Sequence, residues 1–274
     1  MDNYLCGLSQ LHRYFIEVAF NGTAYHGWQC QKNAISVQEI LNKALGTILR
    51  QKIETTGCGR TDTGVHATQL FAHFDLQDNF QHSTLNSQLV AHNLQSATHN
   101  LQLIRSLNSL LPYDIAVKRI VKVASNAHAR FDAVERSYQY HIHFEKDPFK
   151  LGFSWLLKDH PEMQLMNQAA GIIREYEDFS CFSKSNTQTF TNNCHITKAE
   201  WQEVQGGMVF HISADRFLRN MVRAIVGTLI QVGRREIRPE DIRNIIESKN
   251  RCNAGASVPA CGLYLSEVKY PYEI

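Results

Sequence analysis

Apolar positions recur along the chain with two periods, one typical of strands and one of helices. The apolar-rich run 12–20 predicts a strand, and apolar side chains over 37–49 repeat every 3.6 residues as in a helix. Ser36 can cap this helix, and Glu39 completes a capping box. Further strands are predicted at 52–56, 69–76, 114–123, 136–144 and 263–270, a hairpin at 195–213, and helices within 80–111 and over 161–175, 215–232 and 239–249.

The order of elements is strand–helix–strand in both halves of the chain. No linker rich in Pro, Gly or Ser separates the halves. We therefore expect an α+β fold in which two similar, ferredoxin-like halves share a largely antiparallel sheet with helices on one face. The expected halves are 1–123 and 124–274, with an active-site cleft between them.

Composition places the chain among soluble globular proteins. Of its 274 residues, 43% are hydrophobic and 20% are charged, and no run approaches the length of a membrane span. Seven cysteines without a C-x-x-C motif indicate reduced thiols in a cytoplasmic protein, and argue against a disulfide framework or a zinc site. The net charge of +2 permits a nucleic-acid partner without requiring one.

The segment 57–67 combines glycines with polar side chains. Three glycines permit an irregular backbone close to a ligand, and Arg60 and Asp62 lie between them. From spacing alone, two interpretations remain open: a functional loop, or a turn with a solvated Arg–Asp pair.

Arginines recur within the most apolar predicted helix, 215–232. At 100° per residue, Arg216, Arg219 and Arg223 lie within about 60° of one another, opposite the apolar face. This stripe is compatible with a surface for the RNA backbone or with an ordinary solvated helix face.

The string Gly59-Arg60-Thr61-Asp62-x-Gly-Val-His-Ala resembles the signature of the TruA family of tRNA pseudouridine synthases. The resemblance covers nearly the whole chain, although Thr63 replaces the more usual Ala and the segment 80–111 is longer than usual. That segment is either extra helix at the tRNA-binding rim or a solvated insertion. Seven other blocks resemble the family and occur in its order along the chain, at 20–31, 36–39, 110–117, 128–131, 136–140, 217–227 and 262–265.

The resemblance implies a role for five residues. Asp62 is the implied nucleophile, Arg223 its partner, and Arg60 the side chain that fills the space of an extruded uridine. Tyr138 would stack on the target base, and Leu263 would line its pocket. Residue type alone leaves Tyr138 equally compatible with a buried strand tyrosine.

These residue types suit uridine isomerisation. The reaction breaks the N1–C1′ bond and forms a C5–C1′ bond without loss of a group or redox change, so we expect no cofactor and no metal. A carboxylate such as Asp62 can attack C1′ or add at C6, and the sequence does not distinguish these routes. The base must leave the stack, and an aromatic ring such as Tyr138 can hold it.

The function implied by the resemblance is isomerisation of uridine in the anticodon stem-loop of tRNA, at positions 38–40, by a homodimer. Two alternatives come from other classes. A catalytically inactive tRNA-binding module is opposed by the presence of Asp62, Tyr138 and Arg223. A metal-dependent RNA hydrolase is opposed by the absence of a carboxylate or His/Cys cluster in the sequence.

Overall fold

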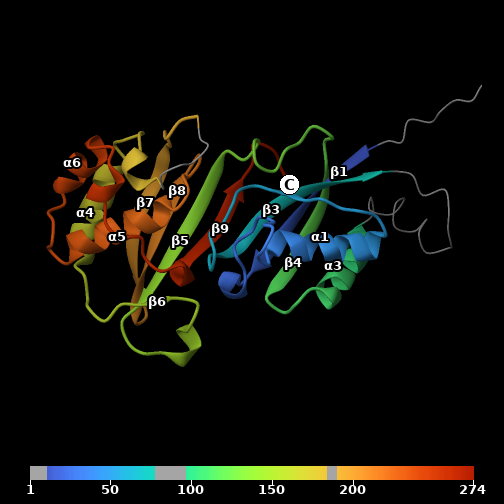
Figure 1. The fold of residues 1–274 in the computed structure, drawn as a ribbon, viewed down its shortest axis with the longest axis horizontal. Helices are drawn as coiled ribbons and strands as arrows, with labels where there is room; N and C mark the ends of the chain where they lie inside the picture. Colours follow the sequence, from blue (N-terminus) through green and yellow to red (C-terminus); the bar gives the residue numbers. More distant parts are fainter. Residues whose placement is uncertain (1–10, 78–96, 184–189) are drawn as a thin grey trace, which may run out of the picture.

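The computed structural model describes residues 11–77, 97–183 and 190–274. One sheet runs through the described part of the molecule in the strand order β4-β1-β3-β9-β5-β8-β7 (Figure 1). Short strands β2 and β6 pair with β3 and β5. The strands are β1 (Leu11–Phe20), β2 (Thr56–Gly57), β3 (His66–Gln77), β4 (Ile115–Val123), β5 (Glu135–His143), β6 (Trp155–Leu156), β7 (Ile196–Val204), β8 (Gly207–Ala214) and β9 (Leu263–Lys269).

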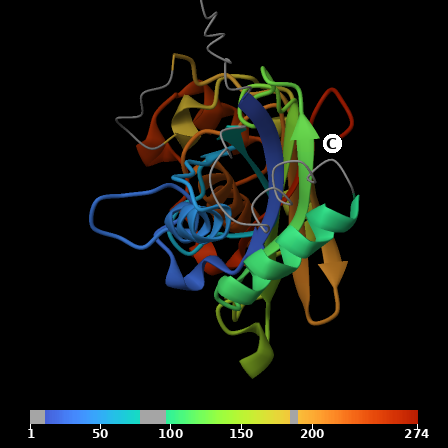
Figure 2. The same cartoon turned by 90° about the vertical axis from the view of Figure 1, so that its right-hand side faces the viewer.

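Helices cover one face of this sheet and one of its edges. The described helices are α1 (Val37–Leu49), α3 (Ala97–Leu110), α4 (Met163–Ile173), α5 (Met221–Gly233) and α6 (Asp241–Glu247). Helices α1, α4, α5 and α6 lie on the same face, whereas α3 lies along the edge strand β4 (Figure 2). The Asn108 side chain of α3 pairs with both the N–H (2.7 Å) and the carbonyl (2.9 Å) of Val117, which satisfies exposed backbone groups of the edge strand.

The two halves repeat one topology. The first half has the order β1-α1-β2-β3-α3-β4 and the second β5-α4-β7-β8-α5-β9, with the short strand β6 and the additional helix α6 aside. In each half the fourth strand pairs with the first, the first with the third, and the third with the second. This is the ferredoxin-like arrangement, so the predicted α+β fold with a largely antiparallel sheet is confirmed.

The halves join through a short parallel pairing of β3 with β9. Only two residue pairs carry it, His66 with Tyr264 and Ala67 with Leu265. The last strand of the chain therefore lies at the centre of the sheet, between the first half and β5 (Figure 1). Each half contributes most of the side chains to its own hydrophobic cluster.

Two element boundaries differ from the sequence prediction. The strand expected at 52–56 is only Thr56–Gly57, and the helix expected from 215 begins at Met221. Asn220 has a left-handed backbone (φ 67°), so the chain turns there before the helix starts. The helix expected within 80–111 is confirmed over Ala97–Leu110, and its earlier part lies outside the described residues.

Buried histidines make the fold sensitive to acid. His73 is 7% exposed, and its Nδ1 accepts a hydrogen bond from the Ala129 N–H at 3.2 Å. Burial, reinforced by the positive charge of Arg13, lowers the pKa of His73 to about 4. Since the unfolded chain takes up this proton near pH 6.5, the contribution of His73 is complete above pH 6.5 and is lost as the pH falls toward 4.

We predict that His73→Asn, which keeps an acceptor without a titrating ring, flattens the loss of stability in acid. The slope of unfolding free energy between pH 6.5 and 4 should fall by up to about 1.4 kcal/mol per pH unit, measured by urea unfolding. Exposed His195 supplies the matched control His195→Asn, which should keep the wild-type slope. An unchanged slope for His73→Asn would contradict the prediction.

Candidate active site

The loop 57–65, between β2 and β3, is packed backbone to backbone against the segment 22–28. Gly27 has a positive φ of 82°, and a Cβ atom there would lie 2.1 Å from the Thr61 carbonyl oxygen. No side chain fits at that distance. The segment 22–28 therefore fixes the path of the loop on one side.

Aromatic residues of the same segment add two further attachments. The Tyr25 carbonyl accepts from the Gly64 N–H at 3.2 Å, and its hydroxyl donates to the Asp114 carboxylate at 2.6 Å. Burial, followed by this hydrogen bond, raises the pKa of Tyr25. The Trp28 indole lies so close to Gly57 that a Cβ there would be 2.4 Å from its nitrogen. The loop is thus connected to β4 as well as to β3.

Asp62 lies partly exposed on this loop and pairs with an arginine of the second half. Its Oδ1 is 3.6 Å from Nε of Arg219, with side-chain exposures of 27% and 62%. Arg223, the expected partner, instead donates from Nε to the Val258 carbonyl at 2.7 Å. The expectation of an Asp62–Arg223 pair is corrected accordingly, because Arg219 lies on the turn before α5 and Arg223 lies within the helix.

The prediction that Arg216, Arg219 and Arg223 lie on one face of a single helix is also wrong. Arg216 and Arg219 belong to the irregular segment 215–220, because α5 begins only at Met221. The helical geometry that placed them in line with Arg223 therefore does not apply. Their positions are set by the turn before the helix and by contacts with distant segments.

Tyr138 reaches the same region from β5. Its register partners, Ile212 on β8 and Leu265 on β9, are both buried, so its ring points to the helix-covered face. There it packs edge to face with Phe217 at 5.1 Å. Burial raises the pKa of Tyr138, and the negative charge of Asp62 contributes to the increase. Phe217 belongs to the same segment 215–220 as Arg219, the partner of Asp62, and the raised pKa keeps Tyr138 protonated at neutral pH.

The two remaining predicted residues lie on the loop and on β9. Arg60 is exposed on the loop, two residues before Asp62. Leu263 is 6% exposed at the start of β9, opposite Tyr140 in the strand register, within the hydrophobic cluster of the second half. The loop and β9 thus present a charged and an apolar side chain to the same region where the halves join.

Arg136, on β5, connects the segments around the site, although the sequence analysis assigned it no role. Its guanidinium donates to four backbone carbonyls, those of Cys58 (3.0 Å), Arg130 (2.7 Å), Ala133 (3.0 Å) and Asp215 (2.8 Å). It therefore links the loop 57–65 to two segments of the second half. Every residue has a backbone carbonyl, so a sequence pattern cannot show which carbonyls Arg136 will bind. The only signal for Arg136 in the sequence is its position in the R-x-Y-x-Y block.

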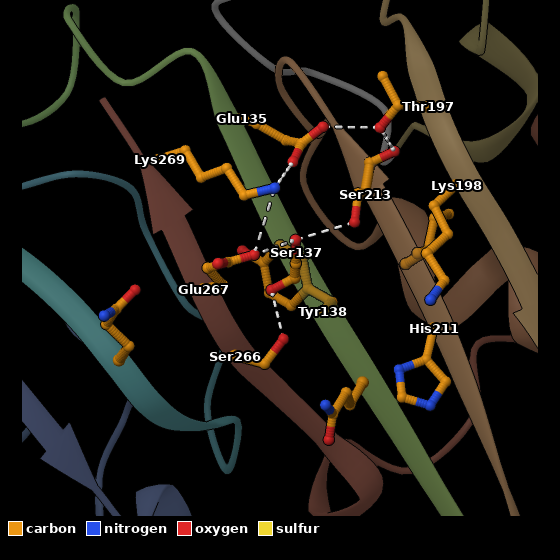
Figure 3. Close-up of a pocket in the computed structure, with 13 residues that line it drawn as sticks. Glu135, Ser137, Tyr138, Thr197, Lys198, His211, Ser213, Ser266, Glu267 and Lys269 are labelled. Carbon is orange, nitrogen blue, oxygen red and sulfur yellow. Dashed lines mark hydrogen bonds and ion pairs between the residues drawn. The ribbon is translucent and has the colours of Figure 1, made fainter. Parts of the chain in front are cut away.

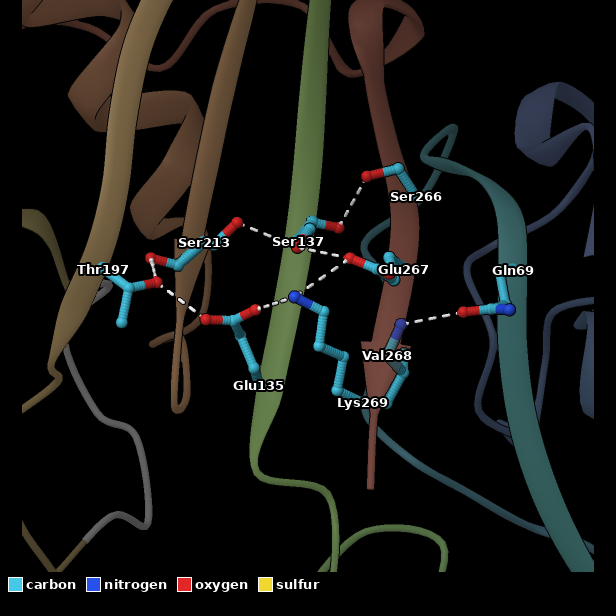
Figure 4. A network of polar contacts seen from close by, with 9 residues as sticks. All are labelled: Gln69, Glu135, Ser137, Thr197, Ser213, Ser266, Glu267, Val268 and Lys269. Carbon is cyan, nitrogen blue, oxygen red and sulfur yellow. Dashed lines mark hydrogen bonds and ion pairs between the residues drawn. The ribbon is translucent and has the colours of Figure 1, made fainter. Parts of the chain in front are cut away.

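A polar hollow lies on the opposite face of the sheet. Ser137 and Ser213 line it (Figure 3) and their hydroxyls are 2.8 Å apart. The Lys269 ammonium pairs with Glu135 at 2.7 Å (Figure 4). Because neighbouring residues on a strand point to opposite faces, Ser137 faces away from the side on which Tyr138 meets Asp62. Lys269 pairs with both carboxylates of this hollow, Glu135 and Glu267, whereas Lys198 pairs with Glu200 outside its lining.

Three further findings concern metal, thiols and membrane. Within 11–77, 97–183 and 190–274, no group of three or more His, Cys, Asp or Glu side chains is placed to hold a metal ion. The six cysteines of these ranges are free thiols. In the same ranges, none of the helices combines the length and apolar character needed to cross a membrane.

Comparison with known proteins gives matches over nearly the full chain. A family model described as tRNA pseudouridine synthase matches residues 176–271. A protein of Bacteroides fragilis named tRNA pseudouridine synthase A is 48% identical over 265 residues, which cover 96% of this chain and 98% of the relative. Proteins of the same name from Bacteroides thetaiotaomicron (47%; 96% and 93% covered) and Porphyromonas gingivalis (46%; 96% and 98% covered) are similarly close.

The repeated ferredoxin-like halves and these matches place the chain in the pseudouridine synthase class of isomerases. More narrowly, it belongs to the tRNA pseudouridine synthase A family, the TruA family whose motifs the sequence resembles.

The glycine contact under the loop can be tested directly. We predict that Gly27→Ala lowers the free energy of unfolding by at least about 2 kcal/mol, because it combines backbone strain at positive φ with a steric clash against Thr61. Urea unfolding measures this change.

Gly171→Ala is the matched control, since this helical glycine on α4 has nothing within 4 Å of an added Cβ. It should stabilise the protein by about 0.5–1 kcal/mol. Equal stability of the two variants would show that the segment 22–28 does not constrain the loop.

Proposed function

We propose that this protein converts uridine to pseudouridine in tRNA, with Asp62 as the nucleophile. The observation that carries the proposal is the ion pair of Asp62 with Arg219 at 3.6 Å, beside the packing of Tyr138 on Phe217, two residues before Arg219. It occurs in a chain 48% identical to a protein named tRNA pseudouridine synthase A. The inactive tRNA-binding alternative is not favoured, because the carboxylate, its cationic partner and the aromatic ring are all present.

The arrangement suits the chemistry of base isomerisation. The N1–C1′ bond breaks, the uracil turns, and a C5–C1′ bond forms before the C5 proton leaves, so no group is gained or lost. The Asp62 carboxylate supplies the nucleophilic oxygen for attack at C1′ or addition at C6. Arg219 pairs with that carboxylate at 3.6 Å and helps to hold it in place. Tyr138, which keeps its proton, offers a stacking surface to the base.

The remaining residues receive roles that follow from their contacts. Exposed Arg60 fills the space left by the extruded uridine, because its planar head can stack and contact phosphate. Leu263 supplies an apolar wall for the base. Arg223, through its bond to the Val258 carbonyl, positions the segment that leads into β9 and Leu263.

The substrate site, assembly and location within the cell are proposed from the family resemblance. We assign the target to the anticodon stem-loop, at positions 38–40, and the active form to a homodimer in the cytoplasm. The names of the relatives give tRNA as the substrate and state neither the modified position nor the assembly.

The proposed structural units are 1–123, which carries the Asp62 loop, and 124–274, which carries Tyr138 and α5. The repeated strand order and the two hydrophobic clusters support this division. The narrow β3–β9 pairing then brings the two units together at the reaction site.

We predict that Asp62→Asn abolishes pseudouridine formation while tRNA binding persists. The amide keeps the shape of the carboxylate but is a poor nucleophile, so kcat should fall by at least about a thousand-fold. The assay maps pseudouridine in unmodified tRNA after incubation with each protein, beside equilibrium binding.

Asp159→Asn is the matched control, because Asp159 also pairs with an arginine, Arg234, at the protein surface. It should retain wild-type activity. Wild-type protein that binds tRNA but forms no product would overturn the proposed function, and product from Asp62→Asn would overturn the role of Asp62.

A further inference from the structure

Arg136 brings together three segments that each carry another arginine. Its bonds to the carbonyls of Cys58, Arg130 and Asp215 connect segments far apart in the sequence. Arg60 follows Cys58 by two residues and Arg216 follows Asp215 directly. Arg60, Arg130 and Arg216, here called the arginine cluster, are therefore gathered around one guanidinium.

The arginine cluster has no compensating carboxylate. Among the described residues, none of its three members has an Asp or Glu oxygen within 4 Å, whereas Arg219 has Asp62. The pKa of Arg130 is lowered, first by burial and then by the positive charges of its arginine neighbours. Such mutual repulsion costs free energy in the unliganded protein, and an anion would relieve it.

The acidic groups nearest in sequence are engaged elsewhere. The Asp215 carboxylate accepts from the backbone N–H groups of His195 and Arg216, both at 2.7 Å. The Asp132 carboxylate accepts from the His128 N–H at 2.8 Å and from the Tyr272 hydroxyl at 2.7 Å. The carboxylates of Asp215 and Asp132 are thus bound by backbone N–H groups and a hydroxyl, and the guanidinium groups of the arginine cluster are available to an anion.

An exposed aromatic ring completes the surface. Phe131 is 74% exposed, although it lies 4.2 Å from the His128 ring and below the Arg130 guanidinium at 5.7 Å. A rigidly supported ring beside arginines is the combination that single-stranded nucleic acids bind, with phosphates on the cations and a base on the ring.

We propose that Arg130 and Arg216, together with Arg60, form a phosphate-binding subsite beside Asp62 that holds the RNA backbone next to the target uridine, with Phe131 stacking on a neighbouring base. This proposal rests on the proposed function. Planar guanidinium groups bind phosphodiester oxygens in pairs. An RNA backbone held beside Asp62 would compensate the free energy of extruding the uridine.

The test measures binding of unmodified tRNA to Arg130→Gln and Arg216→Gln, each made in the Asp62→Asn background, over a series of salt concentrations. Each substitution should weaken binding about ten-fold and lower the slope of log K against log salt by about one. Phe131→Leu should weaken binding without changing that slope. Arg130→Lys, which keeps the charge, should retain the slope.

Arg174→Gln is the matched control, because Arg174 is exposed at the end of α4 and, among the described residues, has no ion pair. It should bind as the parent protein does. With Asp62 intact, the Arg130 and Arg216 variants should show the loss mainly in KM. Unchanged affinity and slope in folded variants, judged by equal unfolding midpoints, would overturn the subsite.

The outcomes separate this proposal from the proposed function. A wild-type enzyme that forms pseudouridine, with variants that bind normally, overturns the subsite alone. Wild-type protein that binds tRNA and forms no pseudouridine overturns the proposed function, while the salt series still decides whether the arginine cluster contacts the backbone of the RNA.

Discussion

The close backbone contact between the segment 22–28 and the loop 57–65 is the constraint on which the site depends. A loop can hold a side chain in place and still leave it open to solvent when the backbone, and not that side chain, makes the packing contacts. Because Gly27 has no side chain, its backbone packs directly against the backbone of Thr61. Thr61 is held in place by this contact, while the neighbouring Asp62 stays partly exposed. The loop backbone therefore packs against the segment 22–28, whereas the side chains of Arg60 and Asp62 are open to solvent.

The second constraint is the insertion of β9 between the two halves. The backbone pairing of β3 with β9 has only two residue pairs, and the Gln69 side chain of β3 adds a hydrogen bond from the Val268 N–H of β9. This junction connects a loop of the first half with a strand of the second. Arg136 reinforces the junction, because it reaches from β5 to the Cys58 carbonyl without needing a carboxylate. Asp62 and Tyr138 thus belong to different ferredoxin-like halves of the chain.

Local signals in the sequence predicted local structure well. Ser36 caps α1 as its side chain suggested, and the strand predicted at 136–144 is β5 (Glu135–His143). Predictions that depended on tertiary contacts were weaker. The left-handed turn at Asn220 delays α5, which moves Arg219 rather than Arg223 toward Asp62. Family resemblance identified the blocks, but the pairing of side chains between blocks is a property of the folded chain.

The distribution of charge explains how a protein with a net charge of only +2 can be suited to a polyanion. Many of its surface arginines are paired with carboxylates, as Arg234 is with Asp159, and so contribute little to the field at a distance. The arginine cluster beside the loop is left unpaired, since the nearby carboxylates are occupied by backbone N–H groups. Positive potential is therefore concentrated where the loop is exposed. A total charge says little about binding when pairing removes the charge from most of the surface and leaves it at one site.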